Sequence, residues 1–173
     1  MAFLLPSASV FFVLMMMTTQ YAISVNAEAT NEEHHSVVKR AIVYGRVAFS
    51  AYLSSRTTYL DNEKIVFDSE VINDGEAYDK SSGIFTVPAT GTYLFAFQFE
   101  DWSNTDQQTA YLMVNGNIIS SAIIKTLGRS TQAGNTVIVH LHKNDNVYVQ
   151  VNLGQVYGSP TERYTTFSGY LLY

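Results

Sequence analysis

Cysteine is absent from the 173 residues of this chain. The protein can therefore form no disulfide, and its core alone must supply the free energy that keeps it folded. The same absence excludes catalysis by a cysteine nucleophile.

Charged residues are also scarce. They make up 14% of the chain, against about a quarter in an average protein, and the net charge is −5. The ten Lys and Arg residues are scattered, so no basic stripe is available to neutralise phosphates, and nucleic acid is not expected as a partner. With 47% hydrophobic and 13% aromatic residues, the composition indicates one β-rich domain with a large core or interface.

Long hydrophobic runs are missing too. Val10–Met17 is an apolar run of eight residues, shorter than the roughly 20 residues that cross a bilayer as a helix, so no membrane span is expected. The run precedes Val25-Asn26-Ala27, a small-x-Ala pattern that signal peptidase accepts. Residues 1–27 are therefore predicted to be a signal peptide and the protein to be secreted and extracellular. A retained anchor or a buried strand is the alternative.

Residues 28–40 are polar and without periodicity, which predicts a flexible leader before a domain over residues 41–173. Lys39-Arg40 fits either a dibasic processing site or two solvated charges. His34-His35 has no other nearby ligand, so a mobile tail is favoured over a metal site.

From Ala41 onward, strand-like segments alternate with turn signals, and no stretch has a helical period. The expected strands are Val47–Leu53, Lys64–Ile72, Ile84–Val87, Tyr93–Phe99, a hairpin over Thr109–Ile119 that turns at Asn115-Gly116, Val137–Leu141, Val147–Leu153 and Thr165–Tyr173. Short strands at near-regular spacing predict an all-β sandwich or jelly roll.

One expected strand carries aromatic residues at every second position: Tyr93, Phe95, Phe97 and Phe99. A period of two places these four rings on one face of the strand. Each ring can bury roughly 150–250 Å², so the four together predict the centre of a core between two sheets. A platform for stacking a cofactor is the less favoured interpretation.

Eight positions keep the intervals of a known signature, in which a Phe, an Asn or Asp and an aromatic residue precede a Phe and a Gly-x-Tyr-x-Phe-x-aromatic run. The matching residues are Phe67, Asn73, Tyr78, Phe85, Gly91, Tyr93, Phe95 and Phe97. On these residues the chain resembles the complement C1q globular-head family over about Ala41 to Tyr173. The resemblance implies a ten-stranded, two-sheet jelly roll, shared with tumour necrosis factor, that assembles as a homotrimer.

The chain departs from that family in two respects. Asn144 stands before Asp145 where many relatives have Gly, and Asn also tolerates the left-handed turn. The collagen-like stalk of complement proteins is missing. The resemblance is therefore to a head-only secreted member of invertebrate type, which puts recruitment of complement proteases in doubt.

Enzyme motifs are not found, so the protein is predicted to be non-catalytic and to need no cofactor. The carboxylates of Glu100-Asp101 are expected to be solvated, because neighbours on a strand point to opposite faces. His140 and His142 share a face and are the better metal candidates, although ordinary surface histidines are favoured.

The segment Glu100–Gln108 is the expected recognition loop, because Trp102, the only tryptophan, lies in it. Exposed, Trp102 would stack on a sugar ring or a partner; folded back, it would cover the core. The resemblance also suggests calcium, with Asp106 and Asn115 near two ligand positions. One carboxylate and one amide would make a weak site for that ion.

By resemblance, the leading functional hypothesis is a secreted, lectin-like pattern-recognition protein of innate immunity that binds microbial polysaccharide or lipopolysaccharide. One alternative is an extracellular matrix protein that handles calcium or other metals. Another is a cytokine-like or synaptic-organiser ligand that binds a receptor protein. The signature residues are expected in the core, so they specify the scaffold and not the ligand.

Overall fold

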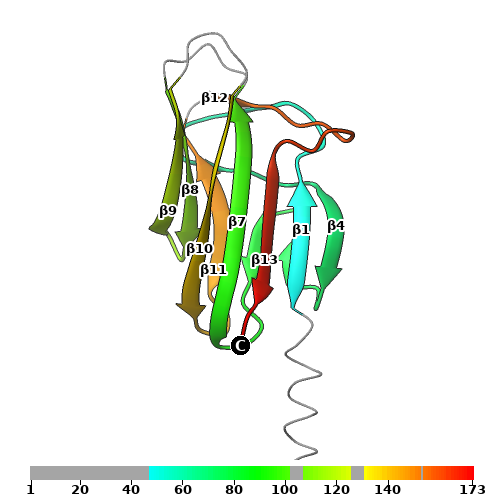
Figure 1. Cartoon of the computed structure of the whole chain (residues 1–173), viewed down its shortest axis with the longest axis vertical. Coiled ribbons are helices and arrows are strands. Elements are labelled where there is room, and N and C mark those ends of the chain that lie inside the picture. The colour runs from blue at the N-terminus through cyan, green and yellow to red at the C-terminus, as the bar shows by residue number, and fades with distance from the viewer. Residues whose placement is uncertain (1–46, 102–106, 126–130, 153) are drawn as a thin grey trace, which may run out of the picture. The chain divides into compact units, whose positions relative to one another are not determined.

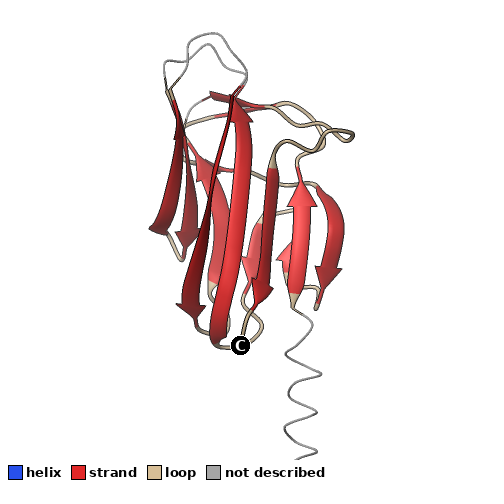
Figure 2. Cartoon of the chain, viewed as in Figure 1, coloured by secondary structure: helices blue, strands red, loops and turns tan. Residues whose placement is uncertain are grey.

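The computed structural model describes residues 47–101, 107–125, 131–152 and 154–173, and every regular element in these ranges is a β-strand (Figures 1 and 2). The predicted signal peptide, residues 1–27, and the predicted leader, residues 28–40, lie outside the described residues. Within the described ranges, no helix is long and apolar enough to cross a membrane.

The strands form two antiparallel sheets, which confirms the predicted all-β jelly roll. The first sheet contains β2 (Thr57–Tyr59), β12 (Gly154–Val156), β7 (Gly91–Asp101), β13 (Thr166–Leu171), β1 (Ala48–Tyr52) and β4 (Ser69–Asp74) in that order, with β10 (Thr131–Leu141) also paired to β7. The second contains β5 (Tyr78–Asp79), β6 (Ile84–Thr86), β11 (Asn146–Val151), β8 (Gln108–Val114) and β9 (Asn117–Ile124), with β3 (Glu63–Lys64) also paired to β11. The described residues thus contain thirteen strand segments where ten strands were expected, because several pairings of two or three residues count separately.

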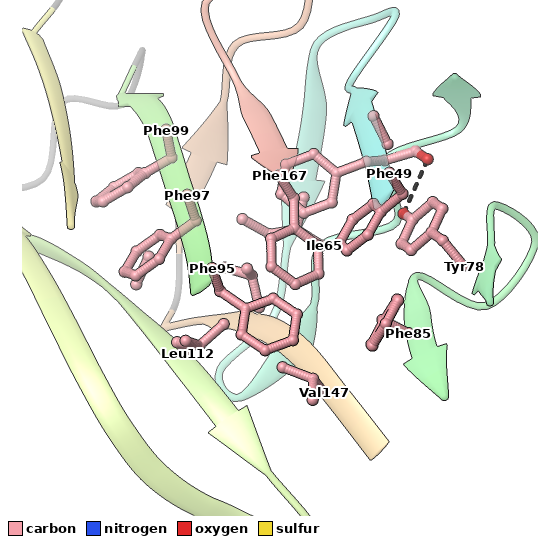
Figure 3. Close-up of a cluster of buried hydrophobic side chains, with 14 of the residues drawn as sticks. Phe49, Ile65, Tyr78, Phe85, Phe95, Phe97, Phe99, Leu112, Val147 and Phe167 are labelled. Atoms are coloured by element: carbon pink, nitrogen blue, oxygen red, sulfur yellow. Dashed lines mark hydrogen bonds between the residues drawn. The ribbon is translucent and has the colours of Figure 1, made fainter. Parts of the chain in front are cut away.

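The rings of β7 lie between the two sheets, as their period of two predicts (Figure 3). Tyr93, Phe95, Phe97 and Phe99 are at most 1% exposed. The Phe95 ring lies 5.4 Å from Phe85 and 6.0 Å from Phe167, measured between ring centroids. These four rings therefore belong to the core, and the cofactor-platform interpretation is wrong.

The other signature residues connect the core to the turns around it. The Asn73 amide donates to the Tyr78 carbonyl (2.8 Å) and accepts from the Tyr78 backbone N–H (3.3 Å), which closes the turn between β4 and β5. The buried Tyr78 hydroxyl donates to the Phe67 carbonyl (3.0 Å). A Cβ atom at Gly91 would come within 2.8 Å of the Tyr173 carbonyl oxygen, so this position has no room for a side chain.

The expected strand Lys64–Ile72 is divided in the structure. β3 pairs with β11 in the second sheet and β4 pairs with β1 in the first, so the intervening residues cross between the sheets. Ile65 and Phe67 are fully buried along this crossing. Asp68 accepts hydrogen bonds from the backbone N–H (2.9 Å) and hydroxyl (2.7 Å) of Ser54. A run of β-branched residues indicates extended chain, but it does not show where the chain changes sheet.

The predicted turns are confirmed. Asn115 and Gly116 have φ angles of 49° and 85° between β8 and β9, as a tight hairpin turn requires. Asn144, which stands where many relatives have Gly, has a φ of 73° between β10 and β11. Asn is one of the few residues that adopt this left-handed conformation at low cost.

Replacement of Phe95 by Ala tests the role of the ring cluster. Because Phe95 is fully buried among aromatic neighbours, Phe95→Ala should lower the free energy of unfolding by about 3–5 kcal/mol. The control Val71→Ala changes a side chain that is 58% exposed and should cost about 0.5 kcal/mol or less. Urea unfolding monitored by fluorescence gives both values, and equal losses would contradict the assignment of the core.

Candidate functional site

The sandwich has two ends with different structures. At the first, which we call the loop end, β7 and β11 finish and β8 begins (Figure 1). Its described residues are 54–66, 100–101, 107–109, 152 and 154–165. At the opposite end, the turn end, lie the turns around Asn115-Gly116 and residues 142–145.

Two carboxylates at the loop end are buried, so the expectation that Glu100-Asp101 is solvated is wrong. Glu100 is 8% and Asp101 1% exposed. β7 continues through both residues, and Asp101 pairs with Val156 on one side and Thr131 on the other. Burial raises the pKa of Glu100. Glu100 and Asp101 are therefore a buried polar pair at the end of β7.

The segment 157–165 is held in one conformation by hydrogen bonds. The Thr165 hydroxyl donates to the Tyr157 carbonyl (2.6 Å), and the Ser159 N–H donates to the Leu53 carbonyl (3.0 Å). The Ser159 hydroxyl accepts from the backbone N–H groups of Thr161 (3.3 Å) and Glu162 (3.2 Å). A Cβ at position 158 would collide with the backbone of Ser55, so this loop packs directly on the segment before β2.

Three tyrosine rings at or beside the loop end each carry a cation. The Arg163 guanidinium lies 4.6 Å from the centroid of the Tyr52 ring. The other pairs are Arg56 with Tyr157 and Lys64 with Tyr148, each at 5.5 Å. Sequence reasoning missed all three pairs, because the partners lie far apart in the chain and no local pattern connects them.

A hollow of about 530 Å³ lies between β2 and β3. We call it the β2–β3 hollow, and its lining residues are Thr57, Thr58, Tyr59, Asn62, Glu63, Lys64 and Val66. Tyr59 is 5% exposed, and burial raises its pKa to about 12. The tyrosine hydroxyl therefore stays protonated at physiological pH.

Asn115 lies at the turn end, where its side chain joins two turns. Its amide N–H donates to an Asp145 carboxylate oxygen (2.8 Å), and its amide oxygen accepts from the Asn146 N–H (2.9 Å). The His142 backbone N–H, which donates to Asp145 at 2.7 Å, is the largest cause that lowers the pKa of Asp145, and Asn115 is the second. Asn115 thus has a structural role in the fold.

The described residues include only part of the predicted ligand site. Trp102 and Asp106 lie outside the described residues. The nearest described residue of β8 after Asp106, Gln108, is at the loop end, and Asn115 follows the far end of that strand. At about 3.3 Å per residue, Gln108 and Asn115 are on the order of 20 Å apart. Calcium binding by Asp106 and Asn115 stays a prediction.

His140 and His142 are neighbours at the turn end, with ring centroids 5.8 Å apart. His140 Nδ1 lies 3.4 Å from the Thr92 hydroxyl, and His142 Nδ1 lies 4.0 Å from an Asp145 oxygen. In the described ranges, no group of three or more His, Cys, Asp or Glu side chains is placed to hold a metal ion. Metal binding by the two histidines stays a prediction.

The contact between the two turns predicts a pH effect. Asn115→Ala removes a donor to Asp145, so the pKa of Asp145 should rise toward its ordinary value of about 3.9. In the wild type, the pKa of Asp145 is lowered by folding. The ionised carboxylate therefore stabilises the fold at any pH above its ordinary pKa, and this stabilisation is lost as the pH falls through the lowered pKa of the folded state. The variant should therefore lose less stability than wild type on acidification to about pH 3.

NMR titration of the Asp145 carboxyl resonance measures the shift. Asn117→Ala, in the same hairpin, is the control and should leave the titration unchanged. An unchanged Asp145 titration in Asn115→Ala would show that the amide contact does not act on the carboxylate.

Comparison with known proteins assigns residues 48–172 to a family model described as "C1q domain". Among curated proteins, complement C1q tumor necrosis factor-related protein 3 of Mus musculus is 32% identical over 126 residues, which cover 71% of this chain and 51% of the relative. Caprin-2 of Danio rerio is 36% identical over 131 residues, which cover 74% of this chain and 14% of the relative. The chain thus spans about half the length of the first relative and a smaller part of the second.

Two solved structures are similar in fold. The globular domain of zebrafish complement 1qA protein has a TM-score of 0.63 and 16% sequence identity, over 74% of this chain and 98% of that one. The Eiger TNF of S. frugiperda has a TM-score of 0.64 and 10% identity, over 74% of this chain and 93% of that one. At these identities, the likeness concerns the fold alone.

Proposed function

Because this chain belongs to the C1q domain family, we propose that it is a secreted, non-catalytic recognition module of innate immunity that binds microbial polysaccharide or lipopolysaccharide. The observation that carries the proposal is the loop end, where a hydrogen-bonded loop and tyrosine–cation pairs occur together with the β2–β3 hollow. Tyrosine rings and fixed polar side chains are the groups that bind sugars without a large loss of conformational entropy.

The proposed extracellular location has two supports. One is the export pattern at residues 1–27. The other is the similarity to a protein named as a complement C1q tumor necrosis factor-related protein. The absence of cysteine does not oppose this location, because the large aromatic core supplies stability without disulfides.

We further propose that the protein is a homotrimer. The outer face of the first sheet carries a row of side chains across four strands, with Ile138, Leu94, Tyr170 and Ala48 in register. Ile138 is 61% and Tyr170 43% exposed in the single chain, and a neighbouring copy would remove this apolar surface from water. Three weak sites on one particle can also raise avidity about 10²- to 10⁴-fold where geometry permits.

A charge placed in this row tests the trimer. Ile138→Glu should convert the particle to a monomer, with a threefold loss of mass in light scattering, because an unpaired carboxylate would be buried in the interface. Ile118→Glu is the matched control: Ile118 is 60% exposed, but it lies on β9 of the second sheet. A wild-type monomer, or a trimer that survives Ile138→Glu, would contradict the proposed assembly.

Binding to surfaces tests the leading function directly. The secreted protein should bind microbial polysaccharides on a glycan array and lipopolysaccharide vesicles, and the monomeric Ile138→Glu variant should bind at least tenfold more weakly. Measurements with calcium and with chelator show whether that ion contributes. Absence of binding to every glycan and to lipopolysaccharide, under both conditions, would overturn the proposal.

A cytokine-like ligand that binds a receptor protein is the second candidate. Its support is the 32% identity to a protein named as tumor necrosis factor-related. Saturable binding to cells that survives removal of cell-surface glycans, without binding to microbial glycans, would favour it. The extracellular matrix or metal-handling alternative has no such support, and calorimetry with calcium, copper and zinc remains its test.

A further inference from the structure

The β2–β3 hollow is open at the molecular surface, and its volume of about 530 Å³ falls within the range of small-molecule sites. β2 belongs to the first sheet and β3 to the second. The short chain between these strands therefore bridges the two sheets at the loop end.

The charges that line the hollow balance. Glu63 supplies one carboxylate and Lys64 one ammonium group, and the other polar lining residues are neutral. One Glu63 oxygen accepts from the Leu60 N–H at 2.6 Å, which leaves the carboxylate's second oxygen as an acceptor. The Glu63 carboxylate would repel a polyanion. A hard cation such as calcium needs six to eight oxygen ligands, and this single carboxylate is too few charged oxygens to bind it.

The lining of the hollow also includes neutral hydrogen-bonding groups. Thr58 offers an exposed hydroxyl group, which both donates and accepts, whereas the Thr57 hydroxyl already donates to the Ser55 carbonyl (3.3 Å). Asn62 accepts from the Gln150 side chain at 3.1 Å through its amide oxygen, so its NH₂ group is the part that can donate to a ligand.

The base of the hollow is less polar. Tyr59 is almost wholly buried, and Val66 is partly buried. The Tyr59 hydroxyl interacts with the Thr57 side chain and the Val66 backbone, which fixes the position of the ring. A sugar ring likewise combines polar and apolar groups, because its C–H groups form apolar faces and its hydroxyl groups project from the edge.

The polar groups are held in place before any ligand arrives. The turn that carries Asn62 has a φ of 64° at that residue, and the amide is bonded to β11. The Lys64 ammonium group lies 5.5 Å from the centroid of the Tyr148 ring, which is also on β11. Groups that are already ordered lose little conformational entropy on binding.

We propose that the β2–β3 hollow binds an uncharged sugar unit, with ring hydroxyls bonded to Thr58, Asn62, Glu63 and Lys64 and the ring's apolar face toward Tyr59. The inference rests on the proposed glycan recognition and names its site and ligand class. Because the net charge of the hollow is zero, affinity for a neutral polysaccharide should change less than about twofold between about 50 and 200 mM salt.

Two variants of the full secreted chain test the site. Asn62→Gly removes the amide while keeping the φ that the turn requires, and Thr58→Val removes an exposed hydroxyl with little change in size. Each should weaken binding of dextran or mannan about three- to tenfold, the equivalent of one hydrogen bond. Asn144→Gly is the matched control, because it also replaces an Asn of positive φ (73°) by Gly, but at the turn end. This variant should leave the affinity for dextran and mannan unchanged.

Isothermal calorimetry with dextran, mannan, acidic alginate and lipopolysaccharide vesicles separates the outcomes. Loss of neutral-glycan affinity in Asn62→Gly and Thr58→Val, with the thermal unfolding temperature of Thr58→Val unchanged, supports the inference. Unchanged affinity in both variants would overturn it. Binding only to alginate or lipopolysaccharide, with strong salt dependence, would overturn it and leave the proposed function intact. No binding to any of these probes would overturn the proposed function as well.

Discussion

The layer of aromatic rings between the two sheets is the contact on which the rest of the structure depends. Phe49 stacks on Tyr78 at 4.8 Å and meets the edge of Phe167 at the same distance, which joins β1, β5 and β13. With no disulfide in the chain, these packed rings fix the separation of the sheets. Strand ends and turns can then differ in sequence without moving the sandwich.

The two ends of the sandwich use that support differently. At the turn end, the polar side chains bond to one another, as Asn115 and Asp145 do. At the loop end, Glu100 and Asp101 are buried, and the partly buried rings of Tyr52 and Tyr157 each have an arginine over them. Both ends hold their polar side chains by internal hydrogen bonds, and the loop end differs in its tyrosine–cation pairs and in the β2–β3 hollow.

Local patterns were sufficient to predict the sandwich, because alternation and turn chemistry act over a few residues. The aromatic strand, the Asn115-Gly116 hairpin and the final strand all follow from such patterns. The eight spaced signature positions supplied the family, since seven of them are ring or turn residues that the core or a turn requires. The eighth, Gly91, is required by the close approach of the chain end.

The candidate site could not be predicted in the same way. The sequence predicts that Glu100 and Asp101 are solvated, but both are buried in the structure. The end of β7 that carries them is paired with β10 on one side and β12 on the other. The β2–β3 hollow depends on the change of sheet after Tyr59 and on contacts such as Gln150 with Asn62, which are distant in sequence. Burial and pairing of this kind are tertiary effects that no spacing rule contains.

Hydrogen–deuterium exchange with and without a bound polysaccharide tests most directly whether the sandwich is invariant and recognition belongs to the loop end. Added protection is expected in residues 54–66 and 154–165, with exchange in β7 and β13 unchanged. Protection centred on residues 115–116 and 140–146 would contradict it.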